Sequence, residues 1–170
     1  VEKSKAHAFA LVATFLSGLT FIGLEIIWSR LFAILLHGTL YGVGAVLISV
    51  LLGIGLGGVL AVPLLGRWER KGVDLGLAYA GIGVVGLVLT ILQLTFVVSM
   101  AYVLASLTGW MGPGWASLHV QLLCVMLFLL PTTVLAGISF PVLIRRTESQ
   151  AAGSGQAMAQ VSAWNTLGSI

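Results

Sequence analysis

The chain of 170 residues is 59% hydrophobic and only 8% charged, with a net charge of +3. A soluble domain of this length needs a charged surface that water can wet, and too few charged residues are present to build one. The composition therefore excludes a soluble globular protein, and the basic excess does not indicate nucleic-acid binding, because the basic residues stand in short clusters between apolar runs.

The first expected membrane span covers residues 6–36 and follows Lys3 and Lys5. As a helix it would be about 46 Å long, which exceeds the roughly 30 Å of the hydrocarbon core, so it is expected to tilt, kink or project. No small-residue cleavage site follows the apolar run, which favours a retained span over a signal peptide.

Two formal charges, Glu25 and Arg30, lie inside this first apolar stretch. A charge within a membrane normally faces a bundle interior or finds a partner. The spacing places the two side chains about 140° apart around a helix, so each can have a different partner. Glu25, Arg30 and the neighbouring Trp28 are the candidates for a substrate contact, an ion contact or a gate. The alternative is a structural clamp between helix ends, or an arginine that extends to water.

The second and third spans are expected over residues 41–65 and 75–99, joined by a charged connection at residues 66–74. A run without Asp, Glu, Lys or Arg extends from Leu75 to Ile144. This run is long enough for two spans joined by an uncharged turn, because one span needs roughly 20 residues.

Two glycine patterns, within residues 53–58 and 81–86, match the dinucleotide-binding fingerprint G-x-G-x-x-G. We reject that interpretation, because both patterns lie inside apolar spans without a preceding strand and turn. Small residues instead let helix backbones approach closely in lipid. The glycines predicted to pack helices in this way are Gly53, Gly57, Gly58 and Gly83.

The fourth span is expected over residues 118–144, after a turn rich in glycine and proline. Pro131 and Pro141 are predicted to kink this helix and to free backbone carbonyls. A polar connection at residues 145–156 leads to a fifth helix over residues 157–170. The prediction for residues 1–170 is one all-α domain, a polytopic transmembrane helical bundle with four full spans and the start of a fifth, truncated relative to a longer protein.

Topology follows from where the basic residues lie. Apart from Arg30, every Lys and Arg precedes the first span, separates the second span from the third, or follows the fourth. The positive-inside rule then places the N-terminus and the connections 66–74 and 145–156 in the cytoplasm. The expected location is a bacterial inner membrane, with the lipid bilayer and other membrane helices as partners.

The sequence contains no pattern typical of catalysis or metal binding. Its single cysteine, Cys124, excludes an intrachain disulfide or a zinc motif built from paired cysteines. We therefore expect no enzyme activity in this segment, no metal and no other cofactor. Gln93 and Gln121 are candidates for hydrogen bonds between helices.

Several stretches carry a family resemblance: Phe15–Gly18 with Leu24–Leu31, Gly38–Tyr41 with Leu52–Gly58, Pro131–Pro141, and Ala163–Gly168. In this order and spacing they resemble the membrane domain of bacterial proteins that fuse a major-facilitator-like helical region to a spermidine-synthase-like domain. The resemblance implies further helices and a soluble domain similar to aminopropyltransferases beyond Ile170. Synthase-like activity is therefore not expected from these residues.

The resemblance implies the N-terminal part of a transporter-like membrane domain, and the family name suggests a small polar or cationic metabolite such as a polyamine. Two other functions stay open. The chain can be a non-catalytic accessory subunit packed in a larger membrane complex, or a membrane anchor for a soluble domain.

Overall fold

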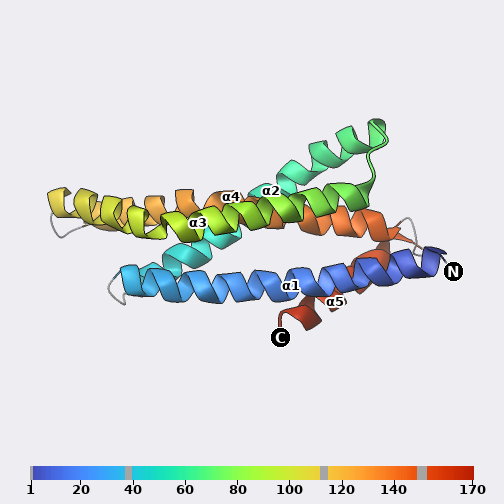
Figure 1. Ribbon diagram of the computed structural model, residues 1–170, viewed down its shortest axis with the longest axis horizontal. Helices are drawn as coiled ribbons and strands as arrows, with labels where there is room; N and C mark the ends of the chain where they lie inside the picture. The colour runs from blue at the N-terminus through green and yellow to red at the C-terminus, as the bar shows by residue number, and fades with distance from the viewer. Residues whose placement is uncertain (1, 37–39, 112–114, 149–152) are drawn as a thin grey trace.

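The computed structural model describes residues 2–36, 40–111, 115–148 and 153–170, and across them the chain is all-helical (Figure 1). The helices are α1 (Glu2–Leu35), α2 (Leu40–Arg70), α3 (Leu75–Met111), α4 (Trp115–Glu148) and α5 (Ser154–Gly168). The first four are long and apolar enough to cross a membrane. The predicted all-α membrane fold is therefore confirmed, and the chain is a membrane protein in contact with lipid.

The charged connection between α2 and α3 is shorter than the predicted residues 66–74, because α2 continues to Arg70. Basic side chains in a last turn interact favourably with the helix dipole, and the Arg70 Nε donates a hydrogen bond to the Gly66 carbonyl at 3.0 Å. Gly72 then turns the chain with a φ of 66°, which glycine adopts without steric cost. Asp74 accepts a hydrogen bond from the Leu77 N–H at 2.9 Å and so caps the start of α3.

Helix α3 continues past its predicted end at residue 99 as far as Met111. In lipid, a backbone that leaves the helix loses hydrogen bonds that no water replaces, so an apolar helix persists until strong breakers occur. The Gly-Pro-Gly sequence at residues 112–114 is such a breaker and lies outside the described residues. Most of the residues predicted to form this turn therefore lie in the last turn of α3 or the first turn of α4.

Helix α4 contains both Pro131 and Pro141 and is assigned as one helix across them. The carbonyls that a proline leaves without a helical partner need another donor or local adjustment. Helix α5 begins at Ser154, slightly before the predicted residue 157, and its last turn is closed by Ser169, whose N–H bonds to the Asn165 and Thr166 carbonyls.

The helices form two closely packed pairs. Helix α2 crosses α4, with α3 lying along α4, while α1 packs against α5 (Figure 1). One apolar cluster, which includes Trp28, Phe32, Val46, Val125 and Leu129, joins α1 to α2 and α4. A second cluster joins α2 to α4 nearer the charged end, and its buried members are Ala61, Leu65, Ile138 and Val142.

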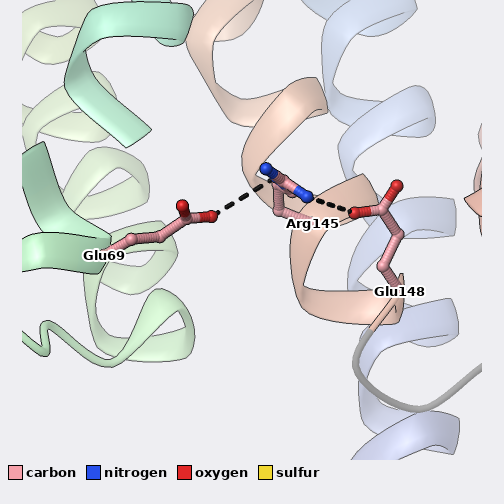
Figure 2. Close-up of polar contacts among 3 residues, drawn as sticks. All are labelled: Glu69, Arg145 and Glu148. Carbon is pink, nitrogen blue, oxygen red and sulfur yellow. Dashed lines mark hydrogen bonds and ion pairs between the residues drawn. The ribbon is translucent and has the colours of Figure 1, made fainter. Parts of the chain in front are cut away.

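The N-terminus, the α2–α3 connection and the C-terminal end of α4 lie at the same end of the molecule (Figure 1). Arg145 joins two of these segments, because its Nε lies 3.3 Å from Glu69 of α2 while its Nη1 lies 2.9 Å from Glu148 of α4 (Figure 2). The neighbouring Arg146 lies over the ring of Phe9, 5.7 Å from its centroid. Three helix ends are thus tied together where the basic residues gather.

Candidate functional site

The three site candidates on α1 have different surroundings. Trp28 is a core residue with 4% of its surface exposed, and its ring lies 5.6 Å from Phe128 and 6.1 Å from Phe32 between centroids. Glu25 is half-buried and Arg30 is exposed. Among the described side chains no ion pair joins Glu25 to Arg30, as their wide angular separation on the helix leads one to expect. The structure does not bring these three residues together.

A cavity of about 720 Å³ lies elsewhere, between all five helices. Its wall is largely apolar, with side chains such as Phe21, Leu24, Leu87, Leu135 and Phe140. A volume of this size is within the range of small-molecule sites, which typically span about 300–1,000 Å³. Neither Glu25 nor Arg30 lines it, so this cavity is not the site that the sequence indicated.

Polar side chains also line the cavity, and all of them are neutral. They are Ser17 and Thr20 of α1, Tyr79 and Thr90 of α3, Thr132 and Ser139 of α4, and Asn165 of α5. Polar groups within membrane helices normally face the bundle interior, and all of these except the exposed Thr20 are buried or half-buried. The cavity therefore offers hydroxyl and amide groups within a mainly apolar wall, and its lining contains no charged residue.

Tyr79 connects two helices that otherwise have little contact. Its ring packs beside the second apolar cluster on α2 and α4, and its hydroxyl donates a hydrogen bond to the Ala13 carbonyl of α1 at 3.3 Å. The Ser17 side chain is a further hydrogen-bond partner of the same hydroxyl. Tyr79 thus bridges α3 and α1 at the edge of the cavity.

The remaining polar groups differ in how much hydrogen-bonding capacity they have left. Thr90 donates to the Gly86 carbonyl at 2.9 Å, and Ser139 donates to the Ala136 carbonyl at 2.7 Å, so both donors are used within their own helices. Thr20 and the Asn165 side chain have no hydrogen-bond partner among the described residues. An amide both donates and accepts, so Asn165 is the most versatile group facing this space.

Gln93 of α3 forms hydrogen bonds with α4 beside Thr132, which lines the cavity. It is 8% exposed, and its Nε2 donates a hydrogen bond to the Phe128 carbonyl of α4. The Thr132 hydroxyl lies 3.3 Å from the Gln93 Oε1. This interhelical hydrogen bond confirms the prediction for Gln93, and it lies in the turn of α4 that contains Pro131, where a neighbouring helix can satisfy backbone groups.

The four glycines predicted to pack helices fall into two groups. Gly53 and Gly57 lie at the α2–α4 crossing, where an added Cβ would overlap Thr133 or the backbone of Val134 and Gly137. Gly58 and Gly83 line the cavity instead, and an added Cβ at either would meet nothing within 4 Å. The second pair therefore leaves space open rather than bringing two backbones together.

The stretches that carry the family resemblance contact one another in pairs. Gly18, in the first stretch, lies against the Asn165 carbonyl in the last, and Gly168 lies against the Phe15 carbonyl. The stretch containing Gly53 and Gly57 meets the one that runs from Pro131 to Pro141. Each pair also contributes lining residues, so the stretches that drew attention in the sequence meet around the cavity.

Tyr79, Thr20 and Asn165 were not among the sequence candidates for a site, because neutral polar residues are common in membrane helices. One signal could have indicated them. Tyr79, Gly83, Gly86 and Thr90 recur at intervals of three or four residues, which places small and polar groups on one face of α3.

Within the described ranges there is no group of three or more His, Cys, Asp or Glu side chains that could hold a metal ion. Comparison with known proteins gives no matching family model, and neither a curated protein nor a solved structure matches significantly. The function must therefore be argued from the cavity and the helices around it.

Proposed function

We propose that this chain is part of a transporter-like integral membrane domain in which α1 to α5 surround a binding cavity for a small molecule. The observation that carries the proposal is the cavity itself, which combines an apolar wall with neutral polar groups from α1, α3, α4 and α5. Apolar pockets with a few convergent polar groups are the usual form of small-molecule sites.

The arrangement of the helices supports this proposal. The α1–α5 pair and the α2–α4 pair are each closely packed through glycines, whereas the cavity lies between them. Transporters commonly move one packed group of helices against another around a central site. Helix α4, which forms one wall, contains two prolines, a sequence feature that is common in the helices bordering transport sites.

We further propose that the basic end faces the cytoplasm of a bacterial inner membrane. The support is the gathering of Arg67, Arg70, Lys71 and the α4 arginines at the end where the N-terminus lies (Figure 1). The chain would then be the N-terminal part of the fused family that it resembles, with its further helices completing the pathway.

Cysteine accessibility in native membranes tests the cavity. With Cys124→Ala as background, Thr20→Cys should react with N-ethylmaleimide, because it lines the cavity, whereas Thr95→Cys, which is also exposed but lies off the cavity, should not. Thiolates form poorly in lipid, which explains the difference. Adding Gly83→Leu should protect the cavity cysteine, and Gly81→Leu, which has equal space but lies off the cavity, should not. Equal reactivity at the two cysteine positions would contradict the proposal.

The second candidate is an accessory subunit of a larger membrane complex. It is favoured by how little of α3 is buried, since only 11% of its most apolar window lies inside the structure. Partner helices could cover this surface and fill the cavity. This alternative expects protection of Thr20→Cys in membranes and co-purification with other subunits at a fixed stoichiometry after detergent extraction.

A further inference from the structure

We propose that the cavity binds an uncharged amphiphile, with a hydroxyl, carbonyl or amide head and an apolar body, rather than a cationic metabolite. This inference rests on the proposed function and names the class of molecule that the same site would accept. It departs from the polyamine that the family name suggests, because the chemistry of the wall differs from what a polyamine requires.

The lining residues provide no counter-charge. A polyamine would bring several ammonium groups into a cavity without a carboxylate, since Glu25 lies outside the lining and the other acids stand at the charged end of the bundle. Moving an ion away from water without a partner is strongly unfavourable. An anionic ligand meets the same obstacle, because no Lys, Arg or His lines the cavity.

Three of the neutral polar groups, on α1, α3 and α5, lie near one level of the bundle. Tyr79 reaches α1 at Ala13 and Ser17, and Gly18, next along α1, lies against the Asn165 backbone. Asn165 therefore lines the cavity close to the Tyr79–Ser17 bridge. A hydroxyl or carbonyl placed there can both accept from and donate to the Asn165 amide.

The remainder of the cavity suits an apolar body. From Tyr79 to Thr90 the lining follows α3 for about 16 Å, at about 1.5 Å per residue. Along this length Gly83 and Gly86 have no side chains that would fill the cavity, and the other lining side chains include Leu24 and Leu135. An extended or flat hydrocarbon body of small-molecule size fits such a space better than a compact polar solute does.

Photo-crosslinking of the whole protein in lipid nanodiscs tests the head group. Three diazirine probes share one dodecyl chain and end in a hydroxyl, a trimethylammonium or a sulfate. We expect the hydroxyl probe to label cavity-lining peptides of α3 and α4 at least about tenfold more than either charged probe, given the cost of an unpaired charge. A butyl alcohol probe added from water separates a water-borne ligand, which it would mimic, from a membrane-dissolved one, which only the dodecyl probe would mimic.

Variants test whether labelling by the hydroxyl probe depends on the polar groups of the cavity. Asn165→Leu should reduce labelling by the hydroxyl probe about fivefold, as expected for the loss of one or two hydrogen bonds. Asn165→Gln should restore part of it, and Thr95→Val, a polar-to-apolar change on the exposed face of α3, should leave it unchanged.

The two proposals fail separately. If the trimethylammonium or sulfate probe labels the cavity as strongly as the hydroxyl probe, the inference about ligand class is overturned while the binding cavity stands. If no probe labels the cavity, or if Gly83→Leu leaves the labelling by every probe unchanged, the binding cavity itself is refuted.

Discussion

At the scale of single residues, the structure assigns to Trp28 a packing role that its position in the sequence did not reveal. Trp28, Glu25 and Arg30 drew attention because two of them are charged within an apolar run. A helix, however, turns by about 100° per residue, so neighbours in sequence face different surroundings. Trp28 faces Phe32 and Phe128, whereas Arg30 faces outward.

Replacing Trp28 by alanine should therefore destabilise the fold rather than change a ligand preference. We expect a loss of about 3 kcal/mol, at the lower end of the range for large aromatic residues, because lipid replaces water around the unfolded helices. Equilibrium unfolding in mixed micelles with increasing dodecyl sulfate measures this loss. Arg30→Gln, on the exposed side of the same helix, is the control and should change stability by less than about 0.5 kcal/mol.

Asp74 links the stability of the α3 start to pH. Hydrogen bonds from the Leu77 and Gly76 N–H groups, with a further contribution from Arg146, lower the pKa of its carboxyl below the ordinary value of 3.8. Since the folded pKa lies below the unfolded one, the stabilisation is complete above about pH 4 and is lost as pH falls through the folded pKa.

Asp74→Ala should cost about 1 kcal/mol at neutral pH, because a helix cap is lost. The difference from the native chain should shrink in thermal unfolding followed below pH 4. Asp74→Asn keeps a capping oxygen without the charge, and a pH dependence as large as that of the native chain in this variant would contradict the assignment.

At the scale of the helices, the close crossing of α2 and α4 depends on glycine. Gly57 and Gly137 face each other so closely that a Cβ on either would overlap the other helix. A repeat of small residues predicts that a helix has a flat face, but it does not tell whether a second helix or an open cavity lies against that face. Gly53 and Gly57 meet a helix, whereas Gly58 and Gly83 border space, and only the tertiary arrangement separates the two cases.

Gly57→Ala should push α2 away from α4 and destabilise the bundle by about 1–3 kcal/mol, the usual cost of overpacking. Gly55→Ala is the matched control two residues away, where an added Cβ meets nothing within 4 Å. Alanine there should be neutral or slightly stabilising, because it favours the helix by up to about 1 kcal/mol. Thermal unfolding of both variants in the same detergent measures the difference. Equal unfolding temperatures for the two variants would contradict the packing role of Gly57.

At the scale of the whole molecule, the sequence predicted the number, order and chemistry of the helices but not the space between them. Hydropathy and charge depend on single residues and their neighbours, so α1 to α4 could be located to within a few residues of most ends. The cavity arises because α1 packs on α5 and α3 packs on α4, which leaves Tyr79 to bridge the gap. That distribution of contacts depends on all five helices together, and no local pattern encodes it.

The orientation across the membrane is the prediction at this scale. With Cys124→Ala as background, Met111→Cys should be labelled by an impermeant maleimide only from the periplasmic side, because residue 111 lies at the end of α3 opposite the basic residues (Figure 1). Lys71→Cys, at the basic end, should be labelled only after the membrane is opened. Labelling of Met111→Cys only from the cytoplasmic side would invert the assignment.

The Arg145 contacts in Figure 2 have a consequence for how the same charge acts before and after folding. While the chain inserts, Arg145 is an unpaired cation and counts fully toward the retention of its segment on one side. Once folded, two carboxylates pair with it, which weakens its attraction for anionic lipid headgroups, and through Glu69 it links α4 to α2. Anchoring to the lipid surface then falls to the other basic residues of this end, such as Arg67, Arg70 and Lys71, and a count of Lys and Arg alone overstates how basic the folded surface is.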